Sequence, residues 1–116
     1  MALILVVDDE PLVRLSAIDM FEKAGHDVIE AANADEAIRI LESRTDISVV
    51  FSDVQMPGSM DGLRLLQLIR DRWPPIRLIL TSGKELPADD GLPEGAVFVP
   101  KPFGQAAVAN ALAAAR

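Results

Sequence analysis

Five short apolar runs, separated by stretches with helical periodicity, are the feature that most restricts how this chain can fold. The runs cover residues 3–7, 28–31, 48–51, 76–80 and 97–99. They are rich in branched aliphatic residues and mostly continuous rather than alternating, which is typical of strands covered on both faces. Strands that alternate with helices and are joined by right-handed crossovers form a parallel sheet. The pattern therefore predicts an α/β fold with helices on both faces of one parallel sheet.

Helical periodicity fills most of the stretches between these runs. The first helix is expected to start near Pro11 and stop at Gly25, because proline suits the first turn of a helix and glycine its end. The second starts at about Asn33, whose side chain can act as the N-cap, and the third starts at Asp61 and stops before a pair of prolines. A last helix follows the fifth run and has apolar residues at Phe103, Ala107, Val108, Ala111 and Leu112.

The stretch from Lys84 to Gly95 interrupts this alternation. It contains Pro87, Gly91 and Pro93, which are too many helix breakers for a helix of ordinary length. We therefore expect at most a turn or two there, so that the helix between the fourth and fifth strands is shortened or missing.

Length and composition restrict the class of protein. The chain of 116 residues has the size of one compact domain, so we expect residues 1–116 to form a single domain with no effector module. Half of the residues are hydrophobic, and a domain of this length buries roughly two-thirds of its unfolded surface, which is enough for a core without staples. The absence of cysteine excludes disulfide scaffolds, thiol catalysis and cysteine-ligated zinc.

The net charge and the N-terminal run argue against two kinds of partner. The charge is −7, from 11 basic and 18 acidic residues, so a surface that follows phosphates would oppose the field of the chain itself. The apolar run 2–7 is too short for a membrane span and has no basic leader before it. We expect no direct contact with nucleic acid, no membrane segment and a cytoplasmic location.

Polar residues follow the predicted strands at their carboxyl ends. They are Asp8 and Asp9 after the first strand, Asp53 after the third, Thr81 after the fourth and Lys101 after the fifth. Ligands of open parallel sheets bind at this edge, where the strand order reverses. Carboxylates gathered there repel one another, so the cluster makes sense if a hard divalent cation lies among them. Mg²⁺ fits the oxygen donors best, with manganese as the alternative.

Asp53 is the best candidate for a nucleophile in this group. Asp8 and Asp9 are adjacent and suit metal binding, whereas Asp53 stands alone on a central strand. A carboxylate beside a cation can attack phosphorus, because positioning and charge neutralisation carry most of phosphoryl transfer. Lys101 can pair with one phosphoryl oxygen and the Thr81 hydroxyl can donate to another. The plainer interpretation is a solvated acidic strand end with Asp53 capping a loop.

Four segments of the chain resemble the response-regulator receiver family of two-component signalling. They are Val6-Val7-Asp8-Asp9-Glu10-Pro11, then Ser52-Asp53-Val54-Gln55-Met56-Pro57-Gly58 with Asp61-Gly62, then Leu80-Thr81-Ser82-Gly83, and finally Pro100-Lys101-Pro102-Phe103. They occur in order, over nearly the whole chain and at separations similar to those of the family. The resemblance implies a doubly wound, flavodoxin-like fold with five strands in the order 2-1-3-4-5.

The resemblance also implies roles for individual residues. Asp53 looks like the phosphoacceptor, which takes a phosphoryl group from a histidine kinase or a histidine phosphotransfer protein. Asp9 and Asp53 look like direct ligands of Mg²⁺, Asp8 acts largely through water, and Gln55 contributes its backbone carbonyl. A domain of this kind catalyses only its own phosphorylation and dephosphorylation and is not otherwise an enzyme.

Thr81 and Phe98 look like the switch pair of the family. Phosphorylation would draw the hydroxyl inward and the aromatic ring would follow, so that a local charge event biases an element with two states. Because Phe98 has no phenolic hydroxyl, its two rotamers would differ by packing alone, and the alternative is a plain core residue. Family members usually have a full helix before the fifth strand as part of an output or dimer face. The broken stretch here departs from that pattern, and we expect a monomer or a weak phosphorylation-dependent dimer.

Two other functions remain as alternatives. A Mg²⁺-dependent phosphohydrolase also uses an aspartate nucleophile, but such enzymes generally place nucleophile and acid two residues apart on the first strand, whereas Asp8 and Asp9 are adjacent. A receiver-like adaptor would bind partners without phosphorylation, and the altered stretch around Pro87 is the feature that favours it.

Overall fold

The fold is a parallel sheet of five strands with helices on both faces. A computed structural model describes residues 2–83 and 91–116. The elements are β1 (Leu3–Val7), α1 (Pro11–Lys23), β2 (Asp27–Ala31), α2 (Ala34–Ser43), β3 (Val49–Asp53), α3 (Gly62–Arg72), β4 (Arg77–Ser82), β5 (Val97–Pro100) and α4 (Gln105–Ala114). The strands lie in the order β2-β1-β3-β4-β5, all parallel. The predicted fold class and strand order are confirmed.

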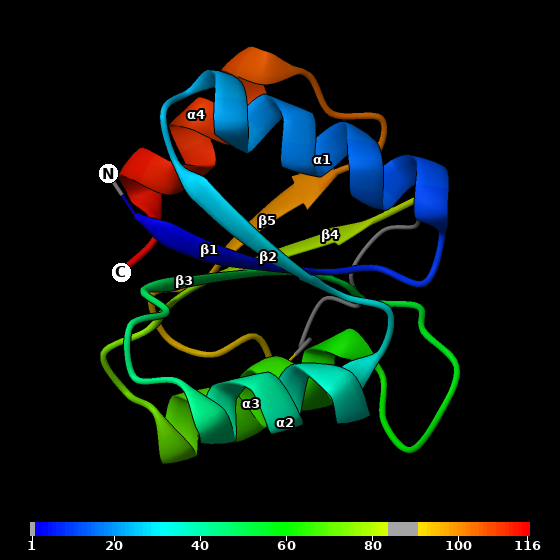
Figure 1. The fold of residues 1–116 in the computed structure, drawn as a ribbon, viewed down its shortest axis with the longest axis vertical. Coiled ribbons are helices and arrows are strands. Elements are labelled where there is room, and N and C mark those ends of the chain that lie inside the picture. Colours follow the sequence, from blue (N-terminus) through cyan, green and yellow to red (C-terminus); the bar gives the residue numbers. More distant parts are fainter. Residues whose placement is uncertain (1, 84–90) are drawn as a thin grey trace.

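The helices form one layer on each side of the sheet. Figure 1 shows α1 and α4 covering one face, with α2 and α3 on the other. The central strand β3 is buried at every residue. Its Phe51 lies in the layer under α1 and α4, where its ring meets Phe21 and Phe103 edge to face at centroid distances of 5.3 and 5.4 Å. Aromatic pairs prefer this geometry, so the three rings fix the position of the central strand between the two helices.

Local signals set the helix ends where the sequence predicts them. Helix α1 begins at Pro11, and the chain turns at Gly25, whose φ of 92° is a conformation that side chains disfavour. The Asn33 side chain accepts a hydrogen bond from the backbone N–H of Glu36, and Asp61 caps α3 in the same way. The predicted N-cap Asn33 is therefore confirmed, and Asp61, where the third helix is expected to start, is the N-cap of that helix.

The strands differ from the prediction by one or two residues at their ends. β3 continues to Asp53, β4 to Ser82 and β5 to Pro100, although their apolar runs end earlier. The backbone ladder continues under the polar side chains, since Asp53 lies opposite Thr81 in the register of β3 and β4. Strand pairing depends on main-chain groups, so the end of an apolar run is not the end of a strand. Asp53 and Thr81 therefore stand on the sheet itself, whereas Asp8 and Lys101 directly follow their strands.

The connection between β4 and β5 is described only in part. Residues 91–96 contain a turn and no helix, while the prediction for residues 84–90 lies outside the described residues. The Gln67 side chain on α3 donates a hydrogen bond of 2.7 Å to the carbonyl of Gly91, which fixes the return of the chain toward β5. Within residues 2–83 and 91–116, every helix is too short or too polar to cross a membrane.

Candidate functional site

The carboxyl ends of four strands bring the predicted site residues to one edge of the sheet. Asp8 follows β1 directly, Asp53 ends β3, and Thr81 lies opposite Asp53 on β4. Lys101 follows β5, where its backbone N–H donates a hydrogen bond of 2.9 Å to the carbonyl of Ser82. Residues that are 20 or more positions apart in the sequence thus meet because parallel strands end at the same edge.

Lys101 lies at the centre of this group. Its ammonium nitrogen is 3.3 Å from Asp53 Oδ2, 3.5 Å from Asp8 Oδ2 and 3.7 Å from Glu10 Oε1. The Asp8 and Asp53 side chains are each only 3% exposed and that of Lys101 17%, whereas that of Glu10 is 62% exposed. One cation therefore faces three carboxylates, two of which are almost completely removed from water.

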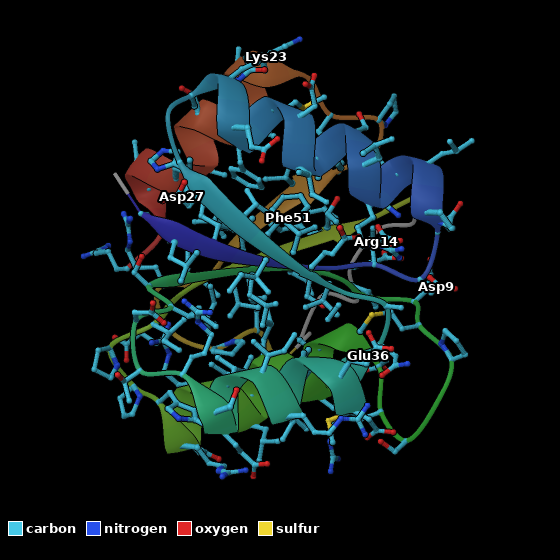
Figure 2. The ribbon with its side chains drawn as sticks, viewed as in Figure 1. Asp9, Arg14, Lys23, Asp27, Glu36 and Phe51 are labelled. Carbon is cyan, nitrogen blue, oxygen red and sulfur yellow. The ribbon has the colours of Figure 1, made fainter. Side chains whose placement is uncertain are left out.

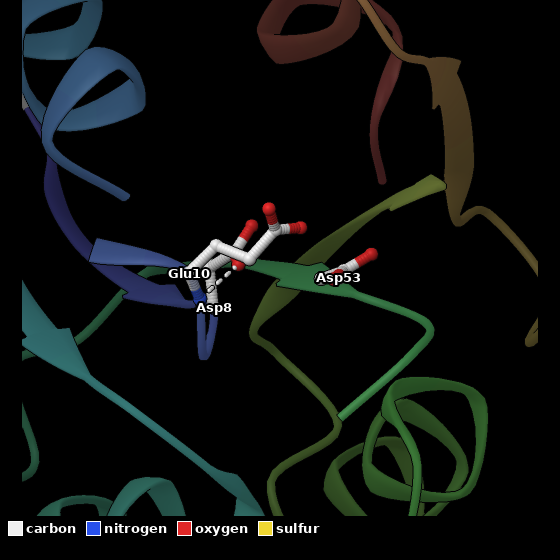
Figure 3. Close-up of side chains that lie close together, drawn as sticks. All are labelled: Asp8, Glu10 and Asp53. Carbon is white, nitrogen blue, oxygen red and sulfur yellow. Dashed lines mark hydrogen bonds between the residues drawn. The ribbon is translucent and has the colours of Figure 1, made fainter. Parts of the chain in front are cut away.

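Three carboxylates form a compact group of oxygen donors. One oxygen each from Asp8, Glu10 and Asp53 lies within 4.8 Å of the other two. Figure 3 shows the Glu10 carboxylate reaching over the site toward Asp53, while its backbone N–H donates a hydrogen bond of 2.9 Å to Asp8 Oδ1. The structure thus brings together Asp8, Asp53, Thr81 and Lys101 as predicted and adds Glu10, which the sequence reasoning did not single out.

Asp9 is placed differently from its neighbours. It is half-buried on the loop between β1 and α1 and does not belong to the compact group of three carboxylates (Figure 2). Its predicted role as a direct metal ligand stays a prediction. The signal that pointed to Glu10 was present in the sequence as the third acid of the run Asp8-Asp9-Glu10.

Burial shifts the pKa values of Asp8, Asp53 and Lys101. Burial raises the pKa of Asp8, although the Glu10 backbone N–H and the Lys101 ammonium oppose the change. Burial and then the Asp8 charge raise the pKa of Asp53, again against the attraction of Lys101. For Lys101, burial alone would lower the pKa, but Asp8, Asp53 and Glu10 outweigh it and raise the pKa. The raised pKa keeps Lys101 protonated, and each of the two buried carboxyls holds a proton more tightly than a free carboxyl does.

Two oxygens in the site lack a hydrogen-bond partner among the described residues. They are Asp53 Oδ1 and Thr81 Oγ1, both fully buried. Buried polar atoms without partners are uncommon, because each loses its contacts with water without replacement. Here they line an all-oxygen group that carries excess negative charge, and oxygen donors of this kind suit Mg²⁺. The residues present therefore fit a divalent ion together with a hydrogen-bond acceptor beside Thr81.

The start of α3 leaves no room for a side chain at Gly62, the residue after the Asp61 cap. A Cβ atom added there would lie 1.8 Å from the backbone oxygen of Asp53, a distance at which atoms overlap. The Gly62 N–H also donates a hydrogen bond of 2.8 Å to the carbonyl of Val54. The Asp61-Gly62 pair therefore lets the start of α3 pack directly against the backbone that carries Asp53.

The remaining predicted residues lie around the group. Gln55 is exposed, two residues beyond Asp53 in the loop after β3. Phe98 is half-buried on β5 and lies opposite Leu80, whereas Thr81 lies opposite Val99. Thr81 and Phe98 are thus on neighbouring strands but offset by one residue. The Lys101-Pro102 peptide bond is cis.

Comparisons with known proteins agree with this geometry. The model of the family described as "Response regulator receiver domain" matches residues 4–113. The sensor kinase CckA of Brucella abortus is 38% identical over 110 residues, which are 88% of this chain and 11% of that protein. The response regulator FleR of Pseudomonas aeruginosa is 36% identical over 115 residues, which are 97% of this chain and 24% of that protein. The chain thus spans less than a quarter of the length of these two relatives.

Solved structures show the same fold. The receiver domain of the hybrid histidine kinase CckA superposes with a TM-score of 0.80 at 34% identity, covering 97% of this chain and 96% of that chain. The response regulator TrrA of Thermotoga maritima, in complex with Mg²⁺ and BeF, has a TM-score of 0.87 at 28% identity and covers 97% of both chains. Together with the acidic strand-end site, these matches show that the chain belongs to the family of response regulator receiver domains.

Proposed function

We propose that this domain accepts a phosphoryl group on Asp53 and passes the signal on through a change of its own structure. The observation that carries the proposal is the state of the Asp53 carboxylate. It is buried, one oxygen is 3.3 Å from the Lys101 ammonium, and the other has no hydrogen-bond partner among the described residues. A carboxylate in this state is a nucleophile held ready beside a cation, with an oxygen free to react.

The transfer step balances with a phosphohistidine as donor. An oxygen of Asp53 forms a bond to phosphorus, and the bond between phosphorus and the imidazole nitrogen breaks. The electron pair of the broken bond stays on that nitrogen, which leaves as neutral histidine when the other ring nitrogen carries a proton. Water later attacks the phosphorus of the aspartyl phosphate, which restores the Asp53 carboxylate, releases inorganic phosphate and ends the phosphorylated state. The domain would thus catalyse only its own phosphorylation and dephosphorylation.

Lys101 and Thr81 would hold the transferred group. The Lys101 ammonium, which already lies within 3.3 Å of Asp53, would pair with one phosphoryl oxygen. The Thr81 hydroxyl, buried and without a partner among the described residues, would donate to another. Fixed donors in a site with little water stabilise the charge of the transition state without having to reorient.

The proposal includes Mg²⁺ as the cofactor. Asp8, Asp9 and Asp53 would hold it with the backbone carbonyl of Gln55, and Glu10 adds a further carboxylate at the edge of the group. When bound, the ion would neutralise phosphoryl oxygens and reduce the repulsion between the attacking carboxylate and the donor. Three carboxylates against one lysine leave a local charge that a divalent cation balances.

A surface beside the site supports a protein as the donor. Leu12 and Leu15 on α1 are 82% and 61% exposed, although most large apolar residues are buried. Leu12 lines a groove of about 470 Å³ together with Lys101 and Phe103. A protein that presents phosphohistidine to Asp53 has to rest beside Lys101, where these apolar side chains would contact it. We propose that this donor is a histidine kinase or a histidine phosphotransfer protein.

The consequences beyond the site follow the expectations from the sequence. Thr81 would move toward the phosphoryl group and Phe98 would then repack, with output through residues 1–116 as one receiver domain. The expected state is a monomer or a weak dimer that forms on phosphorylation. A phosphohydrolase and a phosphorylation-independent adaptor are the competing functions, and no contact in the site favours either of them.

The test is phosphorylation by a small phosphodonor with Mg²⁺, followed by intact mass spectrometry. The wild-type chain is expected to gain one phosphate that is stable in acid and labile in base, and Asp53→Ala is expected to gain none. Asp46→Ala is the matched control, because Asp46 is an aspartate at the opposite end of the sheet and pairs with Arg44. An adduct that persists in Asp53→Ala would overturn the assignment, and continuous release of phosphate from small esters would favour the hydrolase.

A further inference from the structure

The loop that carries the acids is held by one side chain from α1. Arg14 lies one turn into the helix, and its side chain is only 17% exposed because it turns back toward the sheet (Figure 2). Its Nη1 donates a hydrogen bond of 2.6 Å to the backbone carbonyl of Asp8. Its own backbone N–H donates to the carbonyl of Glu10 at 2.9 Å. The bond to Glu10 is the first backbone bond of the helix, so the contribution of the Arg14 side chain is its hydrogen bond to the Asp8 carbonyl.

The guanidinium is itself anchored on a neighbouring strand. Arg14 Nε donates a hydrogen bond of 2.7 Å to Glu30 Oε1 on β2. The adjoining residue of β2, Ala31, accepts a hydrogen bond of 3.1 Å from the backbone N–H of Asp8. A planar guanidinium can satisfy two acceptors in a fixed geometry, which a lysine ammonium on its flexible chain does less well. Helix α1, the acidic loop and β2 are therefore joined through one side chain.

This loop needs such a restraint. The Asp8, Glu10 and Asp53 carboxylates are close enough to repel one another, and two of the three belong to the loop. The N-cap residue of α1 is Glu10, which makes no side-chain capping bond to the helix. Repulsion would thus shift the loop away from Asp53 unless its backbone is fixed from outside the carboxylate group.

We propose that Arg14 is a positioning residue for the divalent-ion site and that Glu30 serves as its anchor. The inference rests on the proposed function, in which a divalent ion lies among these carboxylates. Arg14 acts through the backbone of Asp8 and does not itself contact the ion. Groups that orient metal ligands typically change metal affinity by about 10- to 100-fold when they are removed. Arg14 therefore sets how strongly the loop binds the ion, rather than how fast the loaded site reacts.

The experiment compares Mg²⁺ binding to the wild-type chain and to Arg14→Met by isothermal titration calorimetry. Methionine keeps much of the apolar stem and removes every donor, so we expect the dissociation constant to rise about 10-fold. The rate of phosphorylation at saturating Mg²⁺ should stay within about twofold of wild type, while the Mg²⁺ concentration at half-maximal rate rises with the dissociation constant. Arg14→Lys should recover only part of the affinity, because one ammonium cannot serve both acceptors.

Arg44→Met is the matched control. Arg44 makes an equally short pair with Asp46, 2.7 Å long, but at the far end of the sheet, so its loss should leave Mg²⁺ affinity unchanged. If Arg14→Met does not fold, Glu30→Ala decides in its place, since Glu30 is 58% exposed and its loss removes the anchor alone. Wild-type affinity in the folded Arg14 variant, or in Glu30→Ala when that variant decides, would overturn the inference. Failure of the proposed function is distinct, because the wild-type chain would then take up no phosphate at all.

Discussion

The two ends of the sheet differ in the burial and the pairing of their charged residues. At the far end from the site, exposed residues form closed pairs, with Arg44 and Asp46 2.7 Å apart and Arg72 and Glu42 3.0 Å apart. At the site, Lys101 is the cation that faces three carboxylates at 3.3 to 3.7 Å among the described residues. The exposed pairs are balanced and shorter, whereas the buried group has an excess of negative charge.

This difference bears on how the charged residues at each end of the sheet affect stability and function. Exposed ion pairs contribute little to stability, because water already solvates each partner well. Buried carboxylates without a balancing partner are costly, so they either take up a proton or are compensated by a bound cation. The three carboxylates at the site end of the sheet therefore agree with the proposed divalent cation, which an incoming phosphoryl group would join.

The largest effect should come from removing the Lys101 ammonium from the site. Lys101→Met leaves Asp8 and Asp53 without their partner and takes away a donor to the phosphoryl group, so we expect phosphorylation to slow by about 100-fold. Rates from a small phosphodonor at saturating Mg²⁺ measure the change. Arg44→Met at the other end should phosphorylate like wild type, and equal losses in both variants would contradict the comparison.

The next effect concerns the backbone behind the nucleophile. Gly62→Ala puts a Cβ against the backbone oxygen of Asp53, so α3 has to shift, and we expect a loss of about 1–3 kcal/mol in the free energy of unfolding. Urea denaturation measures it. Gly104→Ala is the control, because a Cβ there meets nothing within 4 Å. Equal stability of the two variants would show that the close approach at Gly62 does not constrain the fold.

A smaller effect should appear in the pH dependence of stability. Burial raises the pKa of Asp53, so the folded state binds the proton more tightly than the unfolded state, whose pKa is near 3.8. The ionised carboxylate therefore destabilises the fold fully above its raised pKa, and the penalty disappears as the pH falls to the unfolded value. With a chelator present, Asp53→Asn should melt higher than wild type at pH 7, by an amount on the order of a few degrees.

The direction in which the melting temperature of Asp53→Asn changes with pH tests whether the Asp53 charge destabilises the fold. The gain of Asp53→Asn in melting temperature should shrink as the pH falls through the raised pKa, and it should vanish below the unfolded value of 3.8, where the wild-type carboxyl is neutral in both states. At the exposed end the hydrogen bond from Arg44 lowers the pKa of Asp46, so Asp46→Asn should bring no gain at pH 7. A lower melting temperature for Asp53→Asn at pH 7 would mean that its charge is already compensated.

The smallest effect is expected for the exposed pair itself. Arg44→Ala breaks a short ion pair that lies entirely in water, and we expect a shift in melting temperature no larger than roughly one degree. Differential scanning calorimetry at low and moderate salt is the measurement. A large, salt-dependent fall in the melting temperature would contradict this expectation and show that the exposed pair contributes to stability.

The sequence predicts the fold and the edge of the site because both depend on backbone pattern. Apolar runs of strand length fix which segments enter the sheet, and parallel strands then bring Asp8, Asp53 and Lys101 to one edge whatever their separation. The N-caps Asn33 and Asp61 are readable for a similar reason, since capping is a local hydrogen bond.

What the sequence does not show is how side chains turn within the loops. Asp8, Asp9 and Glu10 are three acids in a row, and contacts such as the hydrogen bond from the Glu10 N–H to Asp8 Oδ1 distinguish their orientations only in the folded loop. The hydrogen bonds of the Arg14 side chain cannot be predicted from the sequence for the same reason. They join helix α1 to the backbone carbonyl of Asp8 in the loop and to the Glu30 carboxylate on β2. The exposure of Leu12 and Leu15 also breaks the usual rule for apolar residues.

The proposed function requires a divalent ion and a phosphoryl group to bind together beside Asp8, Asp53, Thr81 and Lys101. The most direct measurement is a crystal structure of the chain with Mg²⁺ and beryllofluoride, the combination bound by the related TrrA protein. We expect the beryllium on an Asp53 oxygen, its fluorides in contact with Lys101 and Thr81, and the ion among the carboxylates. Density for both groups away from Asp53, or an empty pocket at saturating concentrations, would contradict it.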